Sequence, residues 1–251
     1  MCHEALADVA NAPKKILTSR HGVDHKETKK VKQHGFSVRN FARRFPTSHE
    51  RWYVAAKLIT DPLYPAVFDI LTATAEPLLD VGCGMGVLSF YLRQRGWNGE
   101  IIGIDFDHRK ISTASKVSKI FGEGLVFSLG DVGTLLPEHR GSITVLDVLQ
   151  YLTAEGRTYL LQESAERITE KGVLIIRTGI LDHSLRFRIT RSVDEMATRV
   201  KWMQAVPVLY PRSVEIVALL AGLGLHGEFK PLWGRTPFNS WLGVFRRTSE
   251  R

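Results

Sequence analysis

Hydrophobic residues follow two different spacings between residues 75 and 180. Short, nearly continuous apolar runs predict five strands, near 77–81, 100–105, 124–128, 142–147 and 172–177. Between these runs apolar residues recur at helical spacing and predict helices near 86–95, 107–120 and 153–169. Strands that alternate with helices in this way indicate an α/β fold with a doubly wound parallel sheet. Ligands of such folds bind at the carboxyl ends of the strands.

Two helices are predicted before the first strand, within residues 47–73. Thr47 or Ser48 can cap a helix that runs to about Ile59. Asp61 and Pro62 then start a second helix. One face of this second helix carries Leu63, Val67, Ile70 and Leu71, which is typical of an amphipathic helix.

After the fifth predicted strand, the regular alternation of strands and helices ends. A long helix is predicted by apolar residues at helical spacing, namely Leu185, Ile189, Val193, Met196, Val200 and Met203. A further helix covers about residues 211–220, with Gly222 as its expected C-cap. Two strands near 226–232 and 240–246 follow, and the segment between them alternates aromatic and polar residues. We therefore expect inserted helices within 184–222 and a C-terminal hairpin within 225–247.

The most informative motif is the glycine-rich sequence D-V-G-C-G-M-G at residues 80–86, which follows an apolar strand and opens a helix. Glycines let a backbone turn approach a ligand closely. The dinucleotide fingerprint G-x-G-x-x-G needs a glycine at position 87, which is Val87 here. Asp80 would also direct a carboxylate toward the place of a pyrophosphate, so the motif favours a nucleoside cofactor that carries positive charge. Asp105 ends the next predicted strand, where doubly wound folds bind a ribose diol.

Three motifs in order give this chain a family resemblance. The pattern D-x-G-x-G-x-G, the acid Asp105 and the sequence Gly130-Asp131-Val132 after the third strand resemble the class I S-adenosylmethionine-dependent methyltransferases. The resemblance covers about residues 75–180. It implies a mostly parallel sheet of seven strands, with an N-terminal helical cap over the substrate pocket.

The resemblance also implies S-adenosylmethionine as the cofactor and suggests which residues bind it. These residues are Asp80, Gly82, Cys83, Gly84, Gly86, Asp105, Phe106, Asp131, Val132 and Asp147. The glycines would line the methionine part of the cofactor, Asp105 the ribose and Asp131 the adenine, while Asp147 would lie near the methionine amine. Asp105 and Asp131 are equally typical of helix N-caps, and Asp147 of a solvated or capping strand end.

Methyl transfer depends largely on holding the acceptor in line with the methyl group, so a base helps only where the acceptor is a weak acid. His183 and Tyr151 are the candidate catalytic bases, with Asp182 as the orienting neighbour of His183. A loop histidine is also often only solvated. Residues 147–150 lack both the Pro-Pro motif of nucleic-acid amino methyltransferases and a reactive cysteine, and few acids cluster near the later strands. We therefore expect a metal-free enzyme that acts on a small molecule.

Arg177, Arg186, Tyr210 and Trp233 are the candidate substrate-binding residues. Arginine offers a two-point contact to a carboxylate or phosphate, and aromatic side chains offer apolar walls. The alternative is that the arginines face water and the aromatic residues fill the core. Residues 47–246, and especially the pairing of segments 146–152 and 231–239, resemble a bacterial branch associated with aryl-polyene or other acyl-derived pigment and lipid biosynthesis. This resemblance implies O- or C-methylation of a small aromatic or acyl acid, free or presented on a carrier protein.

The 251 residues are 44% hydrophobic, which is enough to bury a full core. Residues 1–51 hold 11 Lys or Arg against 5 Asp or Glu, so they carry six of the eight formal positive charges. We expect residues 1–40 to be a basic, disordered leader and residues 41–251 to form the methyltransferase domain. Nucleic acid is therefore not the expected partner. Two alternatives are a nucleic-acid methyltransferase that uses this leader and a cofactor-binding partner subunit without catalysis.

Three further features narrow the class of protein. No apolar run reaches the length of a membrane span, and the N-terminus lacks the apolar stretch of a signal peptide. Cys2 and Cys83 cannot build a disulfide framework or a structural zinc site. A cytoplasmic protein is expected.

Overall fold

The computed structural model describes residues 36–182, 184–199 and 210–248, without the side chains of residues 194–199. The compact unit begins at Phe36, before the predicted boundary at residue 41. The ring of Phe36 packs against Phe41 and Tyr91, with centroids 5.6 and 5.3 Å away. These aromatic contacts tie the start of the unit to the core. Residues 36–40 of the predicted disordered leader belong to this unit, and residues 1–35 lie outside the described residues.

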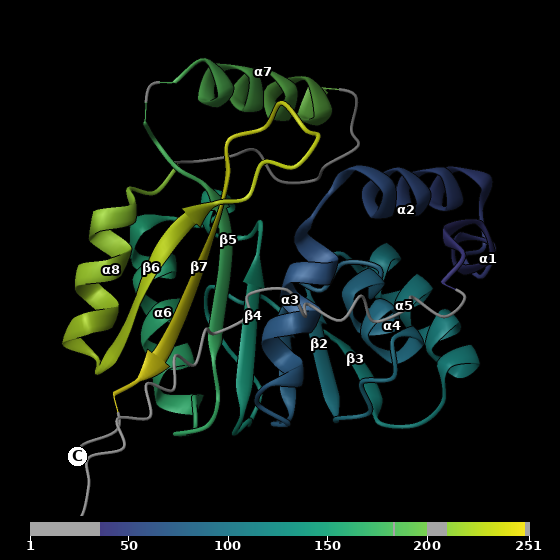
Figure 1. The fold of residues 1–251 in the computed structure, drawn as a ribbon, viewed down its shortest axis with the longest axis horizontal. Helices are drawn as coiled ribbons and strands as arrows, with labels where there is room; N and C mark the ends of the chain where they lie inside the picture. The colour runs from purple at the N-terminus through teal and green to yellow at the C-terminus, as the bar shows by residue number, and fades with distance from the viewer. Residues whose placement is uncertain (1–35, 183, 200–209, 249–251) are drawn as a thin grey trace, which may run out of the picture. The chain divides into compact units, whose positions relative to one another are not determined.

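Seven strands form one sheet (Figure 1). They are β1 (Leu78–Val81), β2 (Ile101–Asp105), β3 (Leu125–Leu129), β4 (Ser142–Leu146), β5 (Leu174–Gly179), β6 (Leu225–Pro231) and β7 (Ser240–Arg247), in the spatial order β3-β2-β1-β4-β5-β7-β6. The first five strands are parallel, and β7 runs antiparallel to both β5 and β6. The predicted fold class is confirmed. Because β2 and β4 pair with opposite edges of β1, the direction of winding reverses there, and a ligand site is expected at the carboxyl end of β1.

The helices occupy the segments between and around these strands. They are α1 (Val38–Ala42), α2 (Ser48–Thr60), α3 (Leu63–Thr72), α4 (Val87–Gln94), α5 (His108–Phe121), the 3-10 helix η1 (Leu149–Tyr151), α6 (Ala154–Arg167), α7 (Leu185–Arg199) and α8 (Ser213–Gly222). The sequence predicted all of them except the short α1 and η1. The expected C-cap of α8 was wrong: Gly222 is its last residue, Leu223 is the cap, and Gly224 takes the left-handed conformation at φ +77°.

Helix α2 begins with a capping box, which settles the choice between Thr47 and Ser48. The Thr47 hydroxyl accepts a hydrogen bond from the Glu50 backbone N–H at 3.2 Å, and the Glu50 carboxylate accepts one from the Thr47 N–H at 2.8 Å. Two N–H groups that a helix start leaves without partners are thereby satisfied. The other Glu50 oxygen accepts from the Thr113 hydroxyl at 2.8 Å. The same box therefore fastens α2 to α5.

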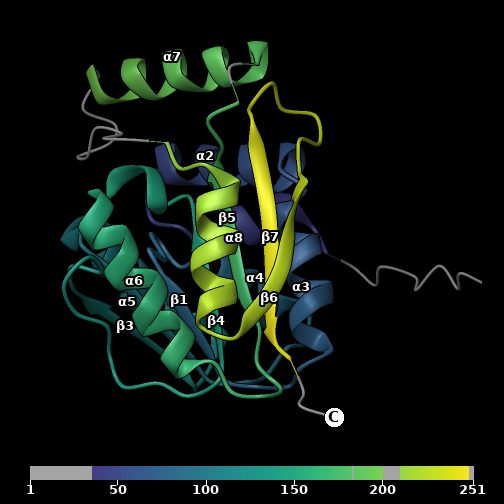
Figure 2. The ribbon, with the colours of Figure 1, turned by 90° about the vertical axis from the view of Figure 1, so that its left-hand side faces the viewer.

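The sheet separates two cores because successive side chains of a strand point to opposite faces. Leu78 belongs to a core with Phe41, Val67 and Phe90, whereas the adjacent Leu79 belongs to a second core. That second core includes Leu160 of α6 and Leu220 of α8. Figure 2 shows α6 and α8 on one face of the sheet and α3 and α4 on the other.

Helices α2 and α7 lie beyond the carboxyl ends of the parallel strands (Figure 1). The loop between β6 and β7, residues 232–239, reaches the same region. The predicted cap is therefore built from an N-terminal helix, an inserted helix and a C-terminal loop. Among the helices that the structure describes, none is long and apolar enough to cross a membrane.

Candidate functional site

The glycine loop after β1 has three residues in the left-handed conformation, at φ +72° for Gly82, +57° for Gly84 and +74° for Gly86. A Cβ atom on Gly82 would overlap Val148, and one on Gly86 would lie 2.9 Å from the rings of Phe90 and Phe127. A Cβ on Gly84 would meet only the Lys110 side chain, at 3.9 Å. Gly82 and Gly86 are thus required by packing within the protein. Gly84 borders open space, where the backbone can approach a ligand.

Asp105 holds this loop in place from the end of β2. Its Oδ2 accepts a hydrogen bond from the Gly84 N–H at 2.9 Å, and its Oδ1 accepts one from the Asp107 N–H at 2.8 Å. The N-cap of α5 is Asp107, whose carboxylate accepts from the Arg109 N–H at 3.0 Å. The capping alternative for Asp105 is therefore wrong. Each of its oxygens has a second lone pair, which leaves room to accept hydrogen bonds from ligand hydroxyls.

Phe106 directly follows Asp105 and is 50% exposed. An aromatic ring exposed at this point gives a planar base an apolar face to stack on.

Asp80 is buried beneath the glycine loop, with a side chain that is 2% exposed. The Thr144 hydroxyl donates to its Oδ1 at 2.7 Å. Burial raises the pKa of Asp80 to about 7 because the charged form loses its hydration; the Thr144 hydrogen bond opposes this shift, and the nearby Asp105 charge adds to it. A buried acid in this state is suited to face a cationic group.

Asp131 and Val132 follow β3 in a turn. One Asp131 oxygen accepts from the Gly133 N–H at 2.9 Å, and the Asp131 carbonyl accepts from the Thr134 and Leu135 N–H groups. The side chain of Asp131 is exposed and that of Val132 is buried. Asp131 thus caps a turn, and its binding of adenine stays a prediction.

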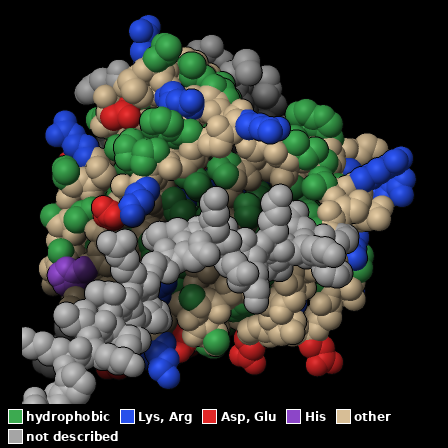
Figure 3. Space-filling model, viewed as in Figure 1, with side chains coloured by type: hydrophobic (Ala, Val, Ile, Leu, Met, Phe, Trp, Pro, Cys, Tyr) green, Lys and Arg blue, Asp and Glu red, His purple; other side chains and the backbone are tan. Residues whose placement is uncertain are grey.

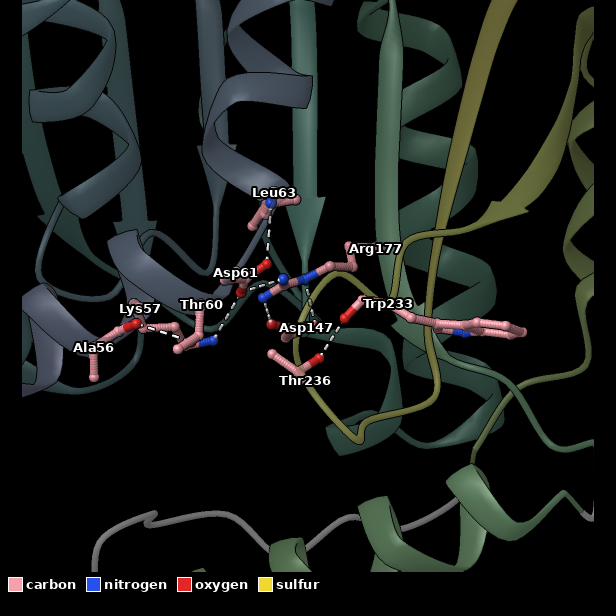
Figure 4. A network of polar contacts seen from close by, with 9 residues as sticks. All are labelled: Ala56, Lys57, Thr60, Asp61, Leu63, Asp147, Arg177, Trp233 and Thr236. Atoms are coloured by element: carbon pink, nitrogen blue, oxygen red, sulfur yellow. Dashed lines mark hydrogen bonds and ion pairs between the residues drawn. The ribbon is translucent and has the colours of Figure 1, made fainter.

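A buried ion-pair network, which we call the Arg177 network, lies at the carboxyl ends of β4 and β5 (Figure 4). Arg177 donates through Nε to Asp147 Oδ1 at 2.9 Å, through Nη2 to Asp147 Oδ2 and through Nη1 to Asp61 Oδ2 at 2.6 Å. Burial would lower the pKa of Arg177, but the two carboxylates outweigh it and raise the pKa far above its usual value. For Asp61, burial acts to raise the pKa, but the positive charges of Arg177 and Lys57 outweigh burial, so the pKa lies below its ordinary value.

This network corrects one prediction and qualifies another. Arg177 is 4% exposed and binds two carboxylates of its own chain, so the prediction that it holds the substrate is wrong. Asp147 is bound to Arg177 but keeps a side chain that is 36% exposed, so its place near the cofactor stays a prediction. No signal in the sequence connects Asp61 with Arg177 or Asp147, because Asp61 lies 116 residues before Arg177.

The loop of residues 232–239 is braced by Arg186 of α7. Arg186 donates to the Thr236 carbonyl at 2.8 Å, and its guanidinium lies 4.7 Å from the centre of the Trp233 ring. A Cβ on Gly234 would lie 2.5 Å from Pro62, so this loop packs against the junction of α2 and α3. Arg186 therefore has a structural role in the cap, and its predicted contact with a substrate is not needed to explain its position.

The other predicted residues lie around the same region. Tyr210 packs edge-on against Phe187, with ring centroids 4.9 Å apart, and covers Gly179 at the end of β5. Tyr151 is half-buried at the end of η1. His183, the other candidate base, lies outside the described residues. Its neighbour Asp182 accepts a hydrogen bond from the Ser184 N–H at 2.9 Å, which ties it to the start of α7.

Two buried polar residues of this region were missed as functional candidates. Asn239 is fully buried; its Nδ2 donates to the Ile180 carbonyl and its Oδ1 accepts from Trp241, so it fixes the base of the 232–239 loop. Gln150 accepts from the Thr178 hydroxyl at 3.2 Å and links η1 to β5. The alternating run of aromatic and polar residues at 233–239 gave no signal for the Asn239 contacts, and Gln150 lies 28 residues from Thr178, so no local spacing connects them.

Figure 3 shows hydrophobic side chains gathered around a hollow between α2 and the 232–239 loop, with Lys and Arg side chains at its margins. Tyr64 is 6% exposed in this region, and burial raises the pKa of its phenol well above the ordinary value, with Tyr53 and Asp61 acting in the same direction. Within the described parts of the chain, no group of three or more His, Cys, Asp or Glu side chains is arranged to hold a metal ion.

Comparisons with known proteins find a matching family model and similar solved structures. Residues 73–210 match a family model described as a methyltransferase domain. Magnesium protoporphyrin IX methyltransferase from Synechocystis PCC 6803, solved with bound SAH, is 17% identical with a TM-score of 0.60, over 83% of this chain and 94% of that chain.

Two further solved structures are similar over 86% of this chain. The pyocyanin biosynthetic protein PhzM is 18% identical with a TM-score of 0.60, and this chain spans 63% of its length. The mitomycin 7-O-methyltransferase MmcR is 15% identical with a TM-score of 0.58, and this chain spans 62% of its length. At these identities the likeness concerns the fold alone. No curated protein sequence matches the chain.

Proposed function

This chain belongs to the methyltransferase-domain family and is a class I S-adenosylmethionine-dependent methyltransferase, and we propose that it methylates an oxygen of a small aromatic molecule. The observation that carries the proposal is the contact above β5 between Gly234 of the C-terminal loop and Pro62 of the α2–α3 junction. A site roofed from two sides suits a compact molecule better than a nucleic-acid strand. The named activity of one similar structure, a 7-O-methyltransferase, favours oxygen over carbon.

The residues at the carboxyl end of β1 fit the cofactor in chemistry. Gly84 borders open space, Asp105 has lone pairs for ribose hydroxyls, and Phe106 offers a stacking face. Asp80 is the buried acid that a cationic ligand would stabilise in its charged form. When bound, S-adenosylmethionine supplies a methyl group on a positively charged sulfur. The protein's part is then to fix the loop, exclude water and orient the acceptor.

The acceptor side of the proposal depends on the cap. The half-buried Trp233 offers aromatic surface, and the exposed part of the Asp147 carboxylate can accept a hydrogen bond from an acceptor hydroxyl. Because Arg177 and Arg186 are both engaged within the protein, a carboxylate on the acceptor has less support than the sequence suggested. His183 and Tyr151 stay the proposed bases for an acceptor that must lose a proton.

The test is turnover with methyl-labelled S-adenosylmethionine over a panel of phenols, benzoic acids, fatty acids and total RNA. We expect labelled product from phenols, with mass spectrometry assigning the methyl group to oxygen. Gly84→Val serves as the control that cannot bind cofactor. Label that enters only RNA would favour the nucleic-acid alternative, and intact binding of S-adenosylhomocysteine without any turnover would favour a non-catalytic subunit.

A further inference from the structure

The carboxylate of Asp61 links the α2–α3 junction of the cap to β5. Asp61 Oδ1 accepts from the Leu63 N–H at 3.0 Å, which shapes the junction of α2 and α3. Its Oδ2 accepts from Arg177 at 2.6 Å and lies 3.4 Å from Lys57 Nζ. Asp61 is 9% exposed, so these contacts are shielded from water. The junction therefore cannot move away from β5 without separating a buried charge from its partner.

The same guanidinium fixes the segment after β4. Asp147 lies in the left-handed region at φ +59°, which is unusual for a residue with a side chain. Its N–H donates to the Arg177 carbonyl at 2.8 Å, and its carboxylate accepts hydrogen bonds from Nε and Nη2 of the Arg177 guanidinium. Both the backbone and the side chain of Arg177 thus hold Asp147 through hydrogen bonds.

The conformation of Asp147 determines where the next residue lies. Val148 is packed so closely on the glycine loop that a Cβ atom on Gly82 would overlap its Cγ2. Gly82 in turn donates its N–H to the Ile104 carbonyl at 2.8 Å. A continuous line of contacts therefore runs from the cap through Asp61, Arg177, Asp147 and Val148 to the cofactor loop.

We propose that Arg177 is a positioning residue that couples the α2–α3 junction to the glycine loop, so that cofactor binding and closure of the cap favour each other. This proposal rests on the proposed function in that the glycine loop must bind the cofactor. One guanidinium serves two carboxylates on different elements, so displacement of either changes how the other is held. Energetic coupling between two sites is reciprocal. Asp61 thereby influences cofactor affinity through Arg177 and Asp147.

The test is calorimetry of S-adenosylhomocysteine with a double-mutant cycle. Asp61→Asn should weaken binding by about fivefold or more. Asp69→Asn removes the same charge from the exposed face of α3 and should leave affinity unchanged. In an Arg177→Gln background Asp61→Asn should have no further effect. Arg177→Lys should fail to restore the coupling because lysine cannot make the forked contact.

A milder variant keeps the proposal testable if removal of a buried charge prevents folding. Binding of S-adenosylhomocysteine to the wild type should slow hydrogen exchange of the amides of Thr60, Asp61, Leu63 and Tyr64. Val148→Ala leaves all charges in place and should abolish that protection. Equal protection in Val148→Ala, or an undiminished effect of Asp61→Asn in the Arg177→Gln background, would overturn the coupling. A wild type that does not bind S-adenosylhomocysteine would instead overturn the proposed function.

Discussion

Asp80 should make the stability of the cofactor-free protein fall as the pH rises from about 4 to about 7. Burial raises its pKa from 3.8 to about 7, so the folded state holds this proton more tightly than the unfolded state. A difference of about three pKa units corresponds to about 4 kcal/mol of unfolding free energy. The contribution is fully present below the unfolded pKa and is lost as the pH passes through the folded pKa. Between pH 5 and 8 the loss should be about 2–3 kcal/mol.

The pKa values of other carboxyl groups are shifted in the opposite direction, so their contribution to stability rises with pH. The measurement therefore needs a matched variant. Burial opposes the lowered pKa values of Glu50 and Asp61, yet hydrogen bonds and nearby positive charges prevail, and these groups stabilise the fold as the pH rises. Asp80→Asn keeps an oxygen that can accept from Thr144 and removes only the titrating group. Urea unfolding of both proteins at intervals from pH 5 to 8 isolates the Asp80 contribution as the difference between them.

We expect Asp80→Asn to gain stability over the wild type by about 2–3 kcal/mol across this range. Parallel stability curves would refute the reasoning, since they would mean that Asp80 is already ionised at pH 5. A cationic ligand favours the ionised form, so S-adenosylmethionine should bind the wild type more tightly as the pH approaches 7. Calorimetry in buffers of different ionisation enthalpy should then detect proton release in the wild type and none in Asp80→Asn.

Three further predictions concern the cofactor loop and the cap. Asp105→Ala should weaken S-adenosylmethionine binding by more than about tenfold, as measured by calorimetry. It should also lower the stability of the cofactor-free protein in urea unfolding by about 1–3 kcal/mol, because the Gly84 and Asp107 N–H groups lose their partner. Unchanged affinity would remove Asp105 from the cofactor site. Gly84→Val should abolish S-adenosylhomocysteine binding in calorimetry, since it fills the open space and strains a residue at φ +57°; retained binding would put the ligand elsewhere. Arg186→Ala should speed hydrogen exchange in residues 232–239 with cofactor affinity unchanged, because the Thr236 carbonyl and the Trp233 ring lose their brace; an unchanged exchange rate would contradict that role.

Local spacing was enough to predict most elements of the fold. Thr47 and Glu50 lie three residues apart, so the capping box is visible in the sequence. Three glycines at alternate positions indicate the loop in the sequence. Glycine is required at Gly82 and Gly86 because a Cβ atom there would lie too close to neighbouring side chains. The short α1 escaped prediction because five residues are too few to show helical periodicity, and its place depends on aromatic contacts with distant residues.

The acceptor side of the site depends on contacts between distant parts of the chain. Arg177 was expected to face a substrate, but its partners lie 30 and 116 residues away in the sequence. No spacing rule connects such residues. A buried arginine within an apolar strand is nevertheless a signal in itself, since the residue is rarely buried without a carboxylate beside it.

The placement of β7 between β5 and β6 sets the order in which this fold can be completed on the ribosome. Strand β5 is buried along its whole length, and its free edge is covered only by β7. Because Ser240 is synthesised long after Gly179, that edge stays open while α7, α8 and β6 emerge. The nascent chain must therefore keep an apolar, unpaired strand from meeting other chains until the closing strand arrives. The topology of the sheet thus makes the edge of β5 the last part of its apolar core to be covered.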